Sequence, residues 1–405
     1  MSLINKRSLK YSQLMLLPNS AEAIFFQAHS FIRDIDGMHA DEALDELCKI
    51  IQIKIMDEKD RIGDEVLNFQ TYIYNSTTDL YNNIIEMQGC FLNGNGKESN
   101  YDKKIKLSPS SVYKVVELLQ KYNFTKTPFD IKGRAFQNLF LPSVRAGMGQ
   151  YFTPLPIVKF IIECVRPTPH DYILDPFCGS GHFLTESMRF VCENYSDSYH
   201  LKKIHEKYFG IEKSERIARV ASTDFKLSGS EEVNIECNDS LLPFVNYNNI
   251  KPESFDYVLT NPPFGSLLGK ESLLFLDDFF LSKEKKTIPL EILGVERSIQ
   301  FLKPGGKLVI VIPDGILVNT QTKYVREWLN RTAIISAIIS LPPETFTPYG
   351  ANVKTSIIFL QKKSKVKKEA KTFMGRFNHS PDDINSVEFI EMKEQLKDHL
   401  QREGW

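Results

Sequence analysis

From Tyr172 onward, the sequence alternates short apolar runs with amphipathic stretches, and this alternation constrains the fold more than any other feature. Apolar runs of about four to eight residues bounded by turns are typical of buried strands, and apolar residues at every third or fourth position are typical of helices. A strand-then-helix alternation predicts an α/β fold, with a largely parallel sheet covered by helices on both faces. In open sheets of this class, ligands bind at the carboxyl ends of the strands.

Four successive predicted strands each end at or near a polar residue. These residues are Asp175, Glu212, Asp239 and Asn261. A single strand-end acid is more typical of a solvated loop, so the prediction of a binding site depends on all four together. Glu212 is placed to accept hydrogen bonds from ribose hydroxyls, as acids do after the second strand of nucleotide-binding sheets. Asp239 is placed to accept from an adenine amino group.

A glycine turn follows Asp175 in the segment Asp175-Pro176-Phe177-Cys178-Gly179-Ser180-Gly181, and a helix is expected from there to about Asn194. Glycines at this point let a ligand approach the backbone at the amino end of the helix. The segment does not match the dinucleotide pattern GxGxxG, because Leu184 stands at the third glycine position. We expect the Asp175 carboxylate to meet the cationic part of a cofactor.

The fourth strand ends abruptly at Asn261-Pro262-Pro263-Phe264, since a proline pair permits neither a ladder nor a helix. An amino nitrogen on a conjugated ring is a poor nucleophile because its lone pair is delocalised. The Asn261 side-chain oxygen and the Pro262 carbonyl can accept its two N–H bonds and free the lone pair, while Phe264 stacks on the ring. The alternative is a turn that merely ends the strand.

The chain divides into three expected parts. Residues 1–148 are predicted to be helical and to contact nucleic acid or another subunit, residues 149–378 to form the sheet domain, and residues 379–405 to form a helical tail. Ser108 is the expected N-cap of a helix over 112–122, and Thr153-Pro154 the expected start of another. We expect 265–289 to be an irregular, lysine-bearing loop, and 355–360 to be the strand that closes the sheet.

Composition narrows the class of protein. The apolar and charged fractions, 42% and 25%, are those of a soluble globular protein, and the lack of an apolar run of about 18 residues predicts no membrane span. The six cysteines show no CxxC spacing, so neither a disulfide framework nor a zinc site is expected. The start does not look like a signal peptide, which favours a cytoplasmic protein. With a net charge of −1, DNA would have to be bound by local patches or by a partner.

Together these motifs resemble the N6-adenine DNA methyltransferases, and specifically the modification subunit of type I restriction-modification systems. The resemblance covers nearly the whole chain and rests on the order of three segments: Gly149-Gln150-Tyr151-Phe152-Thr153-Pro154, then the Asp175 turn, then Asn261-Pro262-Pro263-Phe264. The segments at 130–133, 341–346 and 354–360 are also similar to this subunit.

The resemblance implies a Rossmann-like S-adenosylmethionine-dependent methyltransferase sheet with an amino-terminal helical domain. It implies methyl transfer from S-adenosylmethionine to N6 of a flipped-out adenine, without a metal, at Asn261, Pro262, Pro263 and Phe264. The implied cofactor residues are Gln150, Tyr151, Phe152, Thr153, Asp175, Pro176, Gly179, Ser180, Gly181, Glu212, Asp239, Ser240 and Asn261.

The chain departs from the family pattern at Phe136-Gln137, where Tyr-Glu is commoner, and it shows no target-recognition domain after the last strand. The implied partners are therefore double-stranded DNA and a separate specificity subunit. The resemblance also allows a restriction nuclease subunit as a third partner. Weak, unspecific DNA binding is expected of the chain alone.

Two other functions remain open at the level of the sequence. Asn-Pro-Pro-aromatic presents the same acceptors to an amide or amine of RNA or protein, although the helical region and the Gly-Gln-Tyr-Phe-Thr-Pro segment favour DNA. A cofactor-binding scaffold without catalysis is the other, but a scaffold has no chemical need for Asn261, Pro262 and Phe264 together.

Overall fold

The computed structural model describes residues 8–59, 61–94, 104–139, 153–196, 203–229, 233–269, 278–283, 285–349, 353–364 and 370–405. The chain divides into two compact units. The helical unit comprises Met1–Gly149 and Glu215–Glu231, and the sheet unit comprises Gln150–Ser214 and Glu232–Trp405. The three-part division expected from the sequence stays a prediction.

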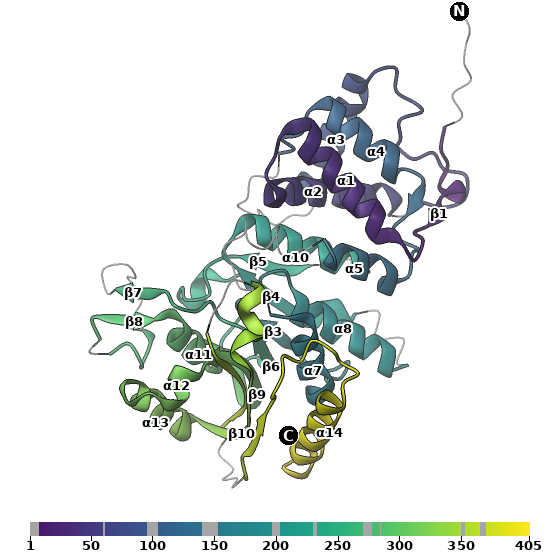
Figure 1. The fold of residues 1–405 in the computed structure, drawn as a ribbon. Helices are drawn as coiled ribbons and strands as arrows, with labels where there is room; N and C mark the ends of the chain where they lie inside the picture. Colours follow the sequence, from purple (N-terminus) through teal and green to yellow (C-terminus); the bar gives the residue numbers. More distant parts are fainter. Residues whose placement is uncertain are drawn as a thin grey trace, which may run out of the picture. The chain divides into compact units, whose positions relative to one another are not determined.

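The helical unit is built from helices whose apolar faces share one core (Figure 1). Its helices are α1 (Ala21–Asp36), α2 (Ala40–Glu58), α3 (Thr77–Gly94), α4 (Pro109–Leu119), α5 (Phe129–Gln137) and α10 (Glu215–Leu227). Two short parallel strands, β1 (Met15–Leu16) and β2 (Tyr122–Asn123), join its loops.

Local sequence explains the ends of these helices. Gly37 ends α1 in the left-handed conformation, with φ of 67°, which glycine adopts without a steric penalty. The Ser108 side chain accepts a hydrogen bond from the Ser111 N–H and caps α4, as predicted, although the helix stops at Leu119. On α10, Arg219 Nε lies 2.6 Å from Asp45 Oδ1 of α2, a buried ion pair within the helical unit.

The sheet unit contains an eight-stranded sheet in the order β12-β10-β11-β9-β6-β3-β4-β5 (Figure 1). The strands β5, β4, β3, β6 and β9 are parallel, whereas β11 is antiparallel to both of its neighbours. The strands are β3 (Ile173–Asp175), β4 (Tyr208–Glu212), β5 (Asn234–Cys237), β6 (Phe255–Thr260), β9 (Leu302–Pro313), β10 (Ala333–Ser340), β11 (Thr355–Lys362) and β12 (Phe373–Arg376).

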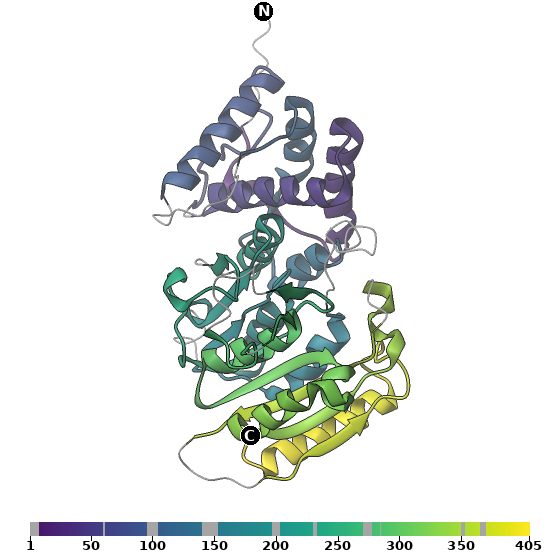
Figure 2. The same ribbon diagram turned by 90° about the vertical axis from the view of Figure 1, so that its left-hand side faces the viewer.

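Helices cover both faces of this sheet. They are α7 (Leu155–Val165), α8 (His182–Asn194), α11 (Leu290–Phe301), α12 (Asp314–Val318), α13 (Lys323–Thr332) and α14 (Val387–Arg402). Along β9, Leu308, Ile310 and Ile312 share a core with α11 and α13. Because side chains alternate along a strand, the buried Val309 and Val311 point to the other face. Helices α7 and α14 pack on each other through edge-to-face aromatic contacts, and α14 also lies along β10 and β12 (Figure 2).

Short 3₁₀ helices lie in several of the connecting segments. They are η1 (Tyr11–Gln13), η2 (Ile204–Lys207), η3 (Phe244–Asn246), η5 (Thr320–Thr322) and η6 (Pro343–Tyr349).

Several sequence expectations need correction. Strand β11 does not close the sheet: it lies between β9 and β10, and the edge is β12, which pairs in parallel with β10 and was not predicted. The expected irregular loop at 265–289 contains an antiparallel pair, β7 (Leu267–Gly269) and β8 (Thr287–Pro289), which projects from the unit (Figure 1). Helix α7 starts at Leu155, with Pro154 as its N-cap and Pro156 in its first turn.

Candidate functional site

A cavity lies at the carboxyl ends of β3, β4 and β6, where the α/β pattern predicts a ligand. We call it the strand-end cavity. It brings together most of the predicted site residues: Thr153, Asp175, Pro176, Gly179, Ser180, Glu212, Asp239, Ser240, Asn261 and Pro263. The predicted residues Gly181, Pro262 and Phe264 lie next to it in the chain but do not line it. Gln150, Tyr151 and Phe152 lie outside the described residues.

The glycine turn predicted between the strand ending at Asp175 and the following helix is present between β3 and α8. Gly179 has φ of 52° and Gly181 has φ of 86°, in the left-handed region that other residues rarely adopt. Gly181 is the N-cap of α8. The Gly179 N–H donates to Glu212 Oε2 over 3.1 Å, so the acid that ends β4 holds the turn after β3.

Asp175 is a buried carboxylate without a cationic partner among the described residues, and its side chain is 1% exposed. Both of its hydrogen bonds end on Oδ1, from Thr260 Oγ1 over 2.6 Å and from the Phe177 N–H over 3.0 Å. Burial raises the pKa of Asp175 to about 7, and the nearby Glu212 charge acts in the same direction. The site therefore favours the approach of a positive charge.

The other two acids hold loops and already accept hydrogen bonds. Glu212 Oε1 accepts from the Ser214 N–H over 2.7 Å, in addition to its bond from Gly179. Asp239 Oδ1 accepts from the Leu241 N–H over 3.0 Å, and Oδ2 forms an ion pair with Lys213 Nζ over 2.8 Å. Since a carboxylate has about four lone-pair sites, each acid can accept further bonds from a ligand.

Asn261 follows the last residue of β6, as predicted. Its amide oxygen Oδ1 is buried and has no hydrogen-bond partner among the described residues. Buried polar atoms are normally paired, so an unpaired acceptor at a cavity wall indicates a site prepared for a donor. Phe264 is 8% exposed and contacts the Phe346 ring edge to face, with 6.4 Å between ring centroids.

The cavity also contains residues that the sequence analysis did not single out. They are Phe177, Cys178, His182, Phe183, Ile211, Lys213, Leu241 and Leu290. Most are direct chain neighbours of predicted residues, so widening each motif by one or two positions would have found them. Leu290 has no such signal, because it enters from α11 through the tertiary fold.

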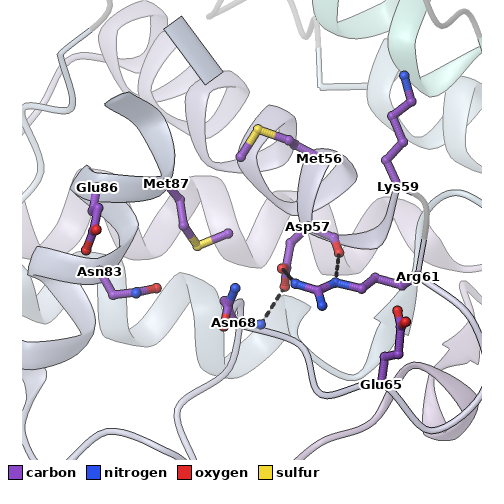
Figure 3. Close-up of a pocket in the computed structure, with 9 residues that line it drawn as sticks. All are labelled: Met56, Asp57, Lys59, Arg61, Glu65, Asn68, Asn83, Glu86 and Met87. Atoms are coloured by element: carbon purple, nitrogen blue, oxygen red, sulfur yellow. Dashed lines mark hydrogen bonds and ion pairs between the residues drawn. The ribbon is translucent and has the colours of Figure 1, made fainter. Parts of the chain in front are cut away.

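A second cavity lies within the helical unit (Figure 3). We call it the helical-unit cavity, and its lining includes Asp57, Arg61, Asn83, Glu86 and Met87. Arg61 Nη2 lies 3.3 Å from Asp57 Oδ1, and the backbone N–H groups of Asn68 and Phe69 donate to Asp57 Oδ2 over 2.8 and 2.7 Å. The buried acid of this cavity is therefore compensated by the protein itself.

No described helix combines the length and apolar character needed to span a bilayer. No three His, Cys, Asp or Glu side chains in the described ranges gather in a way that could hold a metal ion.

The chain is similar in sequence to methylase subunits of type I restriction enzymes. It is 29% identical over 218 residues to the EcoEI methylase subunit of Escherichia coli, a match that covers 53% of this chain and 42% of that protein. It is 26% identical over 282 residues to the MjaVII methylase subunit of Methanocaldococcus jannaschii, covering 65% of this chain and 46% of the other. The matched regions thus span less than half the length of these relatives.

Solved structures confirm the predicted fold. A structure from work on assembly and conformational transition of the type I R-M system matches with a TM-score of 0.71 at 20% identity, covering 96% of this chain and 85% of the other. The type I restriction-modification system methyltransferase subunit from Streptococcus thermophilus matches with a TM-score of 0.63 at 16% identity, covering 96% and 94%. The expected Rossmann-like methyltransferase sheet with an amino-terminal helical part is the observed architecture.

The profile of the N-6 DNA Methylase family matches residues 135–401, which include the whole strand-end cavity. This span is well over half of the chain and contains the glycine turn, the strand-end acids and Asn261. The chain therefore belongs to the N-6 DNA methylase family.

Proposed function

We propose that this chain transfers a methyl group from S-adenosylmethionine to N6 of a flipped-out adenine in DNA, as the modification subunit of a type I restriction-modification complex. The observation that carries the proposal is the buried, unpaired amide oxygen of Asn261 in the same cavity as three strand-end acids. A prepared hydrogen-bond acceptor beside a prepared cation site is what transfer from a sulfonium donor to an amino nitrogen requires. Family membership and the similar methylase subunits support the same reaction.

The donor side of the cavity fits S-adenosylmethionine, which supplies an electrophilic methyl group when bound. Asp175, buried without a cation among the described residues, attracts the positive end of the cofactor through Oδ2, since the bonds from Thr260 and Phe177 both end on Oδ1. Glu212 accepts from ribose hydroxyls, and Asp239 accepts from the cofactor's adenine amino group. Gly179 and Gly181 let the cofactor approach the backbone, and Pro176, Ser180, Ser240 and Thr153 form the remaining wall, with Gln150, Tyr151 and Phe152 in the adjoining segment.

The acceptor side works through Asn261-Pro262-Pro263-Phe264. Asn261 Oδ1 and the Pro262 carbonyl accept the two N–H bonds of the target amino group, which makes its lone pair available for in-line attack on the methyl carbon. The methyl C–S bond would break with its electron pair staying on sulfur, and the methylated nitrogen would release one proton. The two prolines hold these acceptors rigidly, and the Phe264 ring stacks on the base. The base must leave the duplex to reach the site, at a cost of a few kcal/mol.

The proposed partners follow from the same reading. Residues 1–148 contact DNA or another subunit, residues 149–378 carry the reaction, and the tail at 379–405 completes the chain. A specificity subunit selects the DNA sequence, and a restriction nuclease subunit can join the complex. The reaction then takes place in the cytoplasm, where the DNA is.

The test is modified-base sequencing of genomic DNA from cells that carry either the native gene or Asn261→Ala. N6-methyladenine should vanish from one recognition sequence, because losing a prepared hydrogen-bond group at a reacting atom slows the reaction by about a hundredfold or more. Cofactor binding by purified Asn261→Ala protein should stay close to that of the native protein.

Asn83→Ala is the matched control, since the Asn83 amide oxygen is also buried and unpaired among the described residues but lies in the helical-unit cavity. Its methylation pattern should match that of the native gene. An unchanged pattern in Asn261→Ala cells would remove DNA methylation from consideration and favour an RNA or protein substrate. Loss of cofactor binding together with activity would contradict the role given to Asn261.

A further inference from the structure

Helix α11 presents three residues at intervals of three to the loops around the strand-end cavity. They are Glu291, Gly294 and Arg297. Residues at this spacing lie along one face of a helix. Each of them contacts a different part of the site, and none was singled out by the sequence.

Gly294 makes the closest approach of the three residues to the loops of the site. A Cβ atom at this position would lie 2.9 Å from Pro262 Cβ, 3.0 Å from Pro262 Cγ and 3.3 Å from Phe177 Cε2. The distance to Pro262 Cβ is shorter than real Cβ contacts, and the other two are tighter than most of them. A proline ring held between Asn261 and Pro263 has little freedom to move away. Gly294 therefore sits against the acceptor segment and the cofactor turn at the same time.

The flanking residues hold the neighbouring backbone. Glu291 Oε2 accepts a hydrogen bond from the Gly265 N–H over 3.3 Å, directly after Phe264. Arg297 is fully buried between the rings of Phe244 and Phe279, and its Nη2 donates to the Leu241 carbonyl over 3.0 Å. Leu241 lines the cavity beside Asp239. One helix face thus contacts three loops of the site.

We propose that Gly294 is a positioning residue whose missing side chain sets the separation between the acceptor segment 261–265 and the cofactor turn 175–181. Glu291 assists by holding the backbone that follows Phe264. The inference rests on the proposed methyl transfer, in which donor and acceptor must meet in line. A displacement of about 1 Å in such a geometry is enough to slow a reaction by about a hundredfold.

The test uses the complex isolated through a tag on this chain. Its substrate is unmethylated DNA that carries the recognition sequence identified by genomic sequencing. Gly294→Ala should lower the single-turnover rate constant at saturating cofactor by about tenfold to a hundredfold. The Kd for S-adenosylmethionine should change by less than about threefold, since the acids that bind the cofactor remain in place. A merely structural defect would instead lower the thermal midpoint and the fraction of active protein.

Gly89→Ala on α3 is the matched control, because nothing lies within 4 Å of a Cβ added there, and its rate constant should equal that of the native chain. If Gly294→Ala does not fold, Glu291→Ala tests the same helix face and should lower the rate constant severalfold at unchanged cofactor Kd. Suppose that the native complex methylates DNA. If Gly294→Ala then folds and has the native rate constant, the positioning role of Gly294 is wrong while the proposed function stands. If Gly294→Ala does not fold, an unchanged rate constant in Glu291→Ala has the same meaning. A native complex that does not methylate DNA overturns the proposed function as well.

Discussion

The strand-end cavity and the helical-unit cavity contain similar side chains but differ in how the protein compensates their buried aspartate. Each contains a buried aspartate and an asparagine whose amide oxygen is buried and unpaired among the described residues. In the helical-unit cavity, Asp57 accepts from two backbone N–H groups and from Arg61 (Figure 3). In the strand-end cavity, Asp175 accepts two bonds on one oxygen and meets no cation among the described residues, and its pKa is raised to about 7.

This difference separates a structural acid from one that is ready for a ligand. A buried carboxylate that the protein compensates contributes to folding, and its charge is already balanced, so it attracts a ligand cation only weakly. A buried carboxylate that the protein leaves uncompensated destabilises the empty site slightly, and the arrival of a cation relieves that cost. The comparison can be tested by removing each acid in turn.

The largest effect on stability is expected at Asp57. Asp57→Ala leaves the N–H groups of Asn68 and Phe69 without their acceptor and removes the ion pair of Arg61, which keeps only its bond to the main-chain carbonyl of residue 57. Each unsatisfied buried donor costs about 1–3 kcal/mol, so the free energy of unfolding of the helical unit should fall by about 3 kcal/mol. Urea denaturation followed by circular dichroism measures the change.

Glu86→Ala is the control for Asp57→Ala, because Glu86 lines the same cavity but is exposed. Its unfolding free energy should stay within about 0.5 kcal/mol of the native value. An equal loss of unfolding free energy in the two variants would mean that the hydrogen bonds and the ion pair of Asp57 do not stabilise the helical unit.

The effect at Asp175 should appear in binding rather than in stability. Asp175→Asn keeps the shape and can keep the Oδ1 acceptor for Thr260 and Phe177 while removing the negative charge. We expect the Kd for S-adenosylmethionine, measured by titration calorimetry, to rise by about tenfold to a hundredfold, since a buried charge pair is worth a few kcal/mol. The thermal midpoint at neutral pH should not fall.

The pKa of Asp175 also predicts two opposite pH dependences. Because the carboxyl is protonated in the folded chain and ionised in the unfolded chain between pH of about 4 and 7, its contribution to the unfolding free energy falls as pH rises through that window. Cofactor affinity should rise over the upper part of the window, because binding a cation favours the ionised form. Both dependences should be flatter in Asp175→Asn, and an unchanged affinity profile would remove Asp175 from the cation site.

The smallest effect is expected at Lys213, which is 78% exposed and pairs with Asp239. Exposed ion pairs contribute about 0–1 kcal/mol, so Lys213→Ala should leave the thermal midpoint nearly unchanged. Removing the lysine frees Asp239 Oδ2 for the cofactor, so affinity should stay equal or improve by up to about fivefold. A large loss of affinity would instead identify Lys213 as a direct contact of the cofactor.

The strand ends could be predicted from the sequence because their signals are local. Asp175, Glu212 and Asn261 each stand directly at the end of an apolar run, and parallel strands bring such ends to one edge of the sheet. The site residues on α11 could not be predicted, because Gly294 and Leu290 reach the cavity only through packing between elements distant in sequence.

The same reason explains the misplaced strands. The pattern at 355–360 predicts a strand, which is correct, but nothing local says whether that strand lies at the edge of the sheet or between β9 and β10. Strands β7 and β12 are as short as β3 and β5, but each contains a glycine and neither ends in a polar residue that belongs to a recognised motif, as β3 does at Asp175. The ion pair between Lys213 and Asp239 could likewise not be predicted from the sequence, because it depends on the path of two neighbouring loops.

The position of β11 has a consequence for how the chain is made. Strands β9 and β10 leave the ribosome first, yet they are not neighbours in the finished sheet, and each pairs with β11 along its length. Until Thr355–Lys362 has been synthesised, the growing polypeptide therefore carries one unpaired edge on β9 and two on β10, whose other neighbour β12 comes later still. These edges are rich in isoleucine and valine, which is the kind of surface that pairs with other chains. The middle of this sheet is completed late in translation, so nascent chains that stall before β11 are the ones that chaperones must protect from aggregation.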